Sequence, residues 1–169
     1  MVTVADVSAN SNSDKQLSYK AIPMSNEMLQ SAGLSVSEYS GKTVKLVFKD
    51  DYCKRIAYHT PCHMEKLGWA VYSTSLLRLV PGVDFIMLDS QCCGIAGTYG
   101  FKKEHYADSQ KIGENLFRQI VDYQVDMVAT DCETCKWQIE MSAGVQVENP
   151  ISIIADALDV EATIKANRK

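Results

Sequence analysis

The chain has 169 residues, of which 46% are hydrophobic and 22% are charged, a balance typical of a globular domain that builds its own core. The formal net charge is -4 and no basic run or basic helix face is present, which removes the usual electrostatic basis of nucleic-acid binding. The sequence has no run of about 18 uncharged apolar residues and does not start with a charged leader followed by an apolar run, so we expect a cytoplasmic protein without a spanning helix.

The first 42 residues differ in character from the rest of the chain. The tract from Ser8 to Asp14 is polar and lacks large apolar side chains, a composition that resists packing. We therefore expect a flexible or poorly structured segment over residues 1–42, a folded cysteine-rich domain over residues 43–162 and a polar tail over residues 163–169.

Within the expected domain, the hydrophobic pattern alternates between strands and helices. Short apolar runs predict strands over residues 44–48, 55–59, 83–88 and 126–130. Helical spacing predicts helices over residues 64–80 and 103–123, a short helix that carries Cys135, and a last helix that opens at Asn149-Pro150 and runs through Leu158. The alternation predicts an α/β fold with a small parallel sheet, right-handed crossovers and flanking helices.

Two of these helices carry a distinctive apolar surface. The segment over residues 64–80 is apolar over a wide arc, so we expect it to pack on more than one side. Trp69 and Trp137 are expected to lie in the core. The helix over residues 103–123 is expected to present one apolar face, made of Ile112, Leu116, Phe117, Ile120 and Val121.

Five of the six cysteines form three blocks, each of which follows a predicted strand. The blocks are Cys62, the pair Cys92-Cys93 with Gly94 after it, and the CxxC motif of Cys132 and Cys135. They are about thirty and about forty residues apart, roughly one strand–helix unit each. Because ligands bind beyond the carboxyl ends of parallel strands, we expect the five thiols to meet in one site, with Cys53 apart from them.

Thiolates gathered in this way are typical ligands of an iron–sulfur cluster or of zinc. A disulfide framework is disfavoured because cytosolic thiols stay reduced. A structural zinc site needs only four ligands, so five cysteines favour an iron–sulfur centre, with zinc as the alternative. His59 and His63 flank Cys62 and either can ligate or hydrogen-bond a metal centre, although a structural role is the simpler interpretation for both.

Gly94 follows two neighbouring cysteines that cannot face one site from a regular strand, because successive side chains alternate between faces. The backbone must turn there, and glycine permits both the turn and a close approach. Gly97 and Gly100 continue the loop, which matches neither the dinucleotide fingerprint nor the Walker A pattern. We interpret the loop as one that wraps a cofactor, with phosphate binding as the minor alternative.

Residues 58–66, 89–104 and 130–142 resemble the cysteine-rich CCG domain family, whose members include subunits of heterodisulfide reductase and of anaerobic glycerol-3-phosphate dehydrogenase. The resemblance implies an iron–sulfur protein that passes electrons from flavoprotein dehydrogenase subunits toward menaquinone. It also implies peripheral attachment at the cytoplasmic face of the inner membrane. By the same resemblance, a [4Fe-4S] cluster of the non-cubane type is held by Cys62, Cys92, Cys93, Cys132 and Cys135, with Gly94 beside it.

Full-length members of that family carry ferredoxin-type CxxCxxC runs and a first CCG motif ahead of the one seen here, so we expect a fragment or a one-module variant. The sequence shows no catalytic acid–base set and no flavin fingerprint, so we expect electron transfer rather than dehydrogenase turnover by the chain alone. Two other hypotheses stay open: a thiol–disulfide enzyme of the heterodisulfide reductase type, and a zinc-stabilised module that docks partner subunits.

Overall fold

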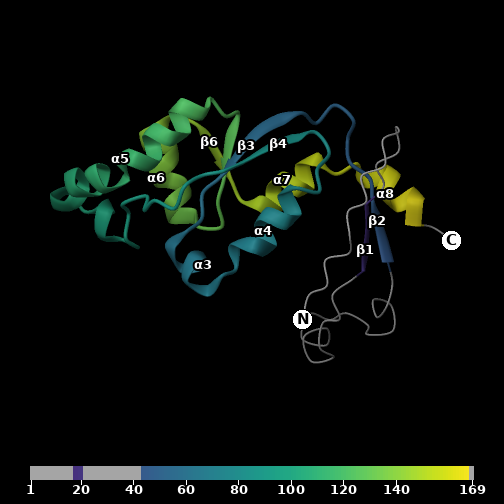
Figure 1. The fold of residues 1–169 in the computed structure, drawn as a ribbon, viewed down its shortest axis with the longest axis horizontal. Helices are drawn as coiled ribbons and strands as arrows, with labels where there is room; N and C mark the ends of the chain where they lie inside the picture. The colour runs from purple at the N-terminus through teal and green to yellow at the C-terminus, as the bar shows by residue number, and fades with distance from the viewer. Residues whose placement is uncertain (1–16, 21–42, 168–169) are drawn as a thin grey trace. The chain divides into compact units, whose positions relative to one another are not determined.

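The computed structural model describes residues 17–20 and 43–167 (Figure 1). Apart from four residues, the segment expected to lack structure over residues 1–42 lies outside the described residues. Those four form strand β1 (Leu17–Lys20). Residues 163–167, expected in a polar tail, belong to helix α8 (Val160–Asn167). Within the described ranges, no helix has the length and the hydropathy that crossing a bilayer requires.

The chain divides into two compact units, and the smaller one contains β1, β2 (Thr43–Leu46) and α8. β1 and β2 pair antiparallel, with Leu17 opposite Leu46. The strand expected over residues 44–48 therefore exists, but it is not part of the parallel sheet. Only a short turn separates it from the next strand, and a parallel pair needs a crossover of a dozen or more residues.

The larger unit, residues 50–157, contains a four-stranded parallel sheet in the order β4-β3-β5-β6. These strands are β3 (Lys54–Tyr58), β4 (Val83–Met87), β5 (Met127–Ala129) and β6 (Gln146–Glu148). In the register, Ile56 of β3 lies opposite Phe85 of β4 and Met127 of β5. The α/β class and the small parallel sheet expected from the sequence are confirmed.

Helices flank this sheet, and alternate residues of its strands point to opposite faces. Ala57, Val128 and Val147 belong to a buried cluster with residues of α5 (Tyr106–Tyr123) and α6 (Glu133–Ala143). Tyr58 takes the other face, where α4 (Ala70–Leu77) and α7 (Pro150–Ala157) pack against each other. Figure 1 shows these two helix pairs in separate places beside the sheet. Two short 3-10 turns, Tyr99–Phe101 and Lys103–His105, lead into α5.

The continuous helix expected over residues 64–80 is wrong, because two helices occupy this segment. α3 (Cys62–Leu67) ends at Gly68, which has a left-handed φ of 66°, and α4 begins at Ala70. The N–H of Gly68 donates to the carbonyl of Glu65 and the N–H of Trp69 to that of Met64, so the last carbonyls of α3 are capped. A glycine within a helical pattern thus ends the first helix and starts a new direction.

The expectation that both tryptophans lie in the core is also wrong. Trp69 is 51% exposed and Trp137 is 50% exposed. Trp69 lies in the break between α3 and α4, and Trp137 contacts the exposed ring of Phe101, with ring centroids 6.0 Å apart. On α5, the core face is made of Leu116, Phe117 and Ile120, whereas Ile112 and Val121 are exposed, because the apolar stripe is wider than the face that the sheet covers.

The predicted start of the last helix is confirmed. The N–H of Ile151 donates to the Asn149 carboxamide oxygen at 3.0 Å, and α7 begins at Pro150.

Candidate metal centre

The three cysteine blocks follow three strands that are neighbours in the sheet. β3 is paired with β4 on one side and with β5 on the other, and all three run parallel. Cys62 begins α3 soon after β3, Cys92 and Cys93 lie in the loop after β4, and Cys132 follows β5 as the residue before α6. The strands therefore deliver all three blocks to one edge of the sheet, where ligands bind in open α/β folds.

Cys93 and Cys135 form the buried part of this site. Their Sγ atoms lie 3.2 Å apart, and the two residues are 1% and 3% exposed. The hydrogen bond shared with Cys135 lowers the pKa of Cys93 to about 5, and smaller effects of His59 and the Ile95 backbone act in the same direction. The same contact raises the pKa of Cys135 well above its usual value. The contact therefore favours the thiolate form of Cys93, which is the form in which cysteine binds a soft metal ion.

Cys62 and Cys92 form the outer part of the site and are exposed. Partial burial and the neighbouring Cys92 both raise the pKa of Cys62, and Cys93 adds a smaller effect in the same direction. The backbone N–H of Gly94 donates to Cys92 Sγ at 3.4 Å. Two thiols at the surface thus lie beside a third that is buried.

Cys132 completes the group from the start of α6. It is half-buried, its Sγ lies 3.2 Å from Thr134 Oγ1, and it raises the pKa of Cys135 after the larger effects of Cys93 and of burial. A direct Sγ–Sγ contact therefore joins Cys93 and Cys135, and electrostatic effects link Cys62 to Cys92 and Cys93, and Cys135 to Cys132. Cys53 precedes β3 and lies at the opposite end of that strand.

Three buried polar atoms near these strand ends have no hydrogen-bond partner among the described residues: His59 Nε2, Thr60 Oγ1 and Thr130 Oγ1. A ring nitrogen of His59 and the Sγ atoms of Cys93 and Cys135 all lie within 4.8 Å of one another. Buried polar groups are normally paired, so orphaned atoms beside a thiol cluster indicate a missing group. Sulfur donors around that place suit iron or zinc. His63, by contrast, is exposed.

A hydrogen-bonded carboxylate supports the CxxC loop, and sequence reasoning missed it. Asp131 accepts from Tyr58 Oη at 2.5 Å and from Ser73 Oγ at 2.8 Å. Burial, followed by the bond to Asp131, raises the pKa of Tyr58. The network ties β3 and α4 to the residue before Cys132. No sequence signal marks it, because the three residues are distant along the chain.

Gly94 and Gly113 let the backbone of α5 approach the CCG loop. Gly94 has a φ of 86°, and a Cβ there would lie 2.0 Å from the carbonyl oxygen of Ser109. A Cβ on Gly113 would lie 2.6 Å from the Cys93 carbonyl oxygen. The close approach expected of Gly94 therefore occurs, and its partner is the protein's own helix. Gln138 donates to Ser109 Oγ at 2.8 Å and links α6 to the same place.

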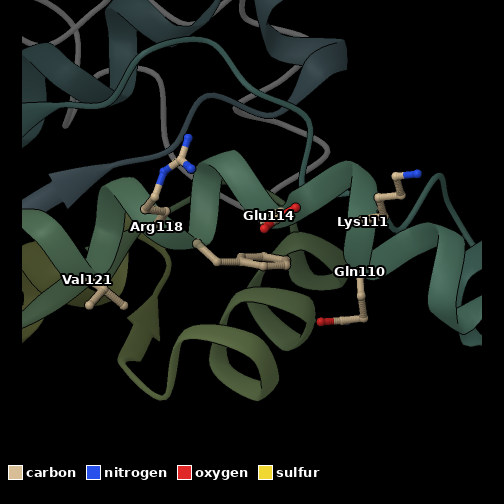
Figure 2. A pocket seen from close by; sticks show the side chains of 6 residues that line it. Gln110, Lys111, Glu114, Arg118 and Val121 are labelled. Atoms are coloured by element: carbon tan, nitrogen blue, oxygen red, sulfur yellow. The ribbon is translucent and has the colours of Figure 1, made fainter.

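A groove of about 520 Å³ runs along α5, and it contains no cysteine (Figure 2). Its lining residues are Gln110, Lys111, Glu114, Phe117, Arg118 and Val121. The groove is open and is lined by charged side chains of both signs. Its lining residues include no thiol and no histidine that could bind a metal. The thiol cluster, and not this groove, is therefore the candidate site.

Known proteins are similar to this chain in sequence. The chain is 62% identical over 104 residues to one of the subunits of the anaerobic glycerol-3-phosphate dehydrogenase of Escherichia coli (strain K12). The matched residues make up 62% of this chain and 26% of the relative. It is 33% identical to an uncharacterized iron–sulfur protein of Methanocaldococcus jannaschii over 109 residues, 63% of this chain and 22% of the relative. It is 27% identical to one of the subunits of the dihydromethanophenazine:CoB–CoM heterodisulfide reductase of Methanosarcina acetivorans over 128 residues, 69% of this chain and 31% of the relative.

The chain thus spans between 22% and 31% of the length of these relatives. No solved structure matches it. The family model described as "Cysteine-rich domain" (CCG) matches residues 56–140, the part of the chain that runs from β3 through most of α6 and contains all three cysteine blocks. The chain therefore belongs to the CCG cysteine-rich domain family.

Proposed function

We propose that this chain is an iron–sulfur electron-transfer module of an anaerobic glycerol-3-phosphate dehydrogenase. The observation that carries the proposal is that the three cysteine blocks follow three adjacent parallel strands, with the thiols of Cys93 and Cys135 in direct contact. The similarity to one of the subunits of that dehydrogenase supports the choice of complex. The proposed ligands are Cys62, Cys92, Cys93, Cys132 and Cys135, with Gly94 shaping the loop.

A bound [4Fe-4S] cluster, of the non-cubane type by family resemblance, would supply one-electron transfer. The proposed ligands differ in their exposure to solvent. Cys93 and Cys135, which are buried, would hold the side of the cluster away from water, and Cys62 and Cys92, which are exposed, would hold the side toward solvent. An electron donor or acceptor can therefore approach the site from the side of α3.

Exposed apolar side chains lie on that side, next to Cys62 in the sequence. They are Leu67, Trp69, Val71 and Tyr72, each between 51% and 56% exposed. Exposed apolar patches mark interaction sites. We propose that the flavoprotein subunits of the dehydrogenase dock here and that electrons continue toward menaquinone. In this proposal the complex stays peripheral to the cytoplasmic face of the inner membrane.

The test is metal and sulfide analysis of anaerobically purified protein. We expect iron and acid-labile sulfide near four each per chain, as a [4Fe-4S] cluster requires. Cys93→Ser should lower the iron content, whereas Cys53→Ser, the matched control at the other end of β3, should not. Equal iron in the two variants would contradict the assignment of the ligands.

A thiol–disulfide enzyme is the second candidate, and the buried Cys93–Cys135 contact at 3.2 Å favours it. A pKa of about 5 makes Cys93 a thiolate at neutral pH, as redox-active thiols are. A metal-free protein that reduces disulfides and loses this activity in Cys93→Ser would support this candidate. A zinc-stabilised docking module is the third, and zinc without sulfide would indicate it.

A further inference from the structure

His59 is buried next to the thiols of Cys93 and Cys135. It directly follows β3, and its backbone N–H donates to the Ala129 carbonyl of β5 at 2.9 Å. The residue is 1% exposed. A ring nitrogen lies within 4.8 Å of both Cys93 Sγ and Cys135 Sγ. Any group held by these two thiols is therefore within reach of the imidazole.

The Nε2 atom of His59 has no hydrogen-bond partner among the described residues. Leaving a buried polar group unpaired costs free energy, so this atom calls for a partner beyond those that the described residues supply. Thr60 and Thr130, whose hydroxyls are also buried and unpaired, lie at the same strand ends. The imidazole thus has an unpaired nitrogen, and its ring lies beside the two thiols that would hold the bound group.

We propose that His59 donates its Nε2–H to a sulfur atom of the cluster held by Cys93 and Cys135, as a positioning residue and not as a further ligand. This inference rests on the proposed function. Five thiols already supply the ligands, and a neutral imidazole protonated on Nε2 is a donor. A hydrogen bond to sulfur stabilises the reduced, more negative state of the cluster and so raises its reduction potential.

The test is a redox titration of the anaerobically purified chain, followed by EPR, in three variants. In His59→Phe we expect iron content like that of the unmodified protein. We also expect an equilibrium constant for reduction about tenfold lower, which is a fall of 59 mV for one electron. His59→Gln should keep most of the potential, because its amide can donate. His63→Phe is the matched control, since His63 is exposed and flanks the same cysteine, and it should change nothing.

An unchanged potential in His59→Phe would overturn the proposal. Loss of iron from both His59 variants would also overturn it, because that result would indicate that His59 is a ligand. Pulsed EPR of the unmodified chain with ¹⁵N-labelled histidine gives an answer that does not depend on the folding of any variant. A weak nitrogen coupling supports the donor role, whereas a strong coupling of a direct ligand, or none, overturns it. Unmodified protein without iron would instead remove the proposed function itself.

Discussion

Gly94 and Gly97 provide a matched pair that tests whether the CCG loop is shaped by its contact with α5. Both glycines have a positive φ, 86° and 68°, so alanine at either position is strained by about 1–2 kcal/mol. They differ in the space available for an added Cβ atom. A Cβ on Gly94 would lie 2.0 Å from the Ser109 carbonyl oxygen, whereas a Cβ on Gly97 meets nothing within 4 Å.

The overlap at Gly94 involves backbone that cannot rotate away, so it adds an overpacking cost of about 1–3 kcal/mol. We therefore expect Gly94→Ala to lower the free energy of unfolding by about 2–5 kcal/mol and Gly97→Ala by about 1–2 kcal/mol. Urea unfolding under anaerobic, reducing conditions gives both values, and iron per chain reports whether the neighbouring Cys93 has moved. Equal destabilisation by the two substitutions would refute the claim that packing on Ser109 shapes this loop.

Two further predictions concern the surroundings of the site. Tyr58→Phe removes the hydroxyl that donates to Asp131 at 2.5 Å, and we expect a loss of about 1–3 kcal/mol in urea unfolding. Folding raises the pKa of Tyr58 above 10.0, so the stability that its hydroxyl contributes is complete below that pH and is lost as pH rises further. The free energy of unfolding of Tyr58→Phe should therefore depend less on alkaline pH than that of the unmodified chain. Equal dependence in the two proteins would contradict this prediction. Trp69→Ser should weaken binding to the flavoprotein subunits in a pull-down without changing iron content. Val121→Ser, a control at a residue that is 60% exposed on α5, should bind normally. Equal binding of both variants would exclude the α3–α4 surface as the docking site.

Much of the sheet could be predicted because three of its strands are short apolar runs that are followed by cysteines. β3, β4 and β5 fall where the sequence predicts strands, and the cysteines after them mark their carboxyl ends. β6 has one apolar residue, Val147, between Gln146 and Glu148, which is too little for a strand pattern to appear. The break at Gly68 was hidden because the apolar spacing continues across it.

The supporting parts of the site depend on tertiary contacts that no local pattern records. Asp131 is an ordinary loop carboxylate until the fold places Tyr58 and Ser73 around it. His59 stands beside Cys62 in the sequence, but its ring lies near Cys93 and Cys135, from two other blocks. Only the pairing of β3 with β4 and β5 creates this neighbourhood.

X-ray absorption of the anaerobically purified chain, recorded at the iron and zinc edges, tests the central claim most directly, because it reports which metal is bound, its ligand atoms and the presence of other iron atoms nearby. The account predicts sulfur in the first coordination sphere together with iron–iron scattering, the signature of a cluster held by thiolates. Sulfur-coordinated zinc, single iron atoms without iron–iron scattering, or a chain that holds no metal would contradict it.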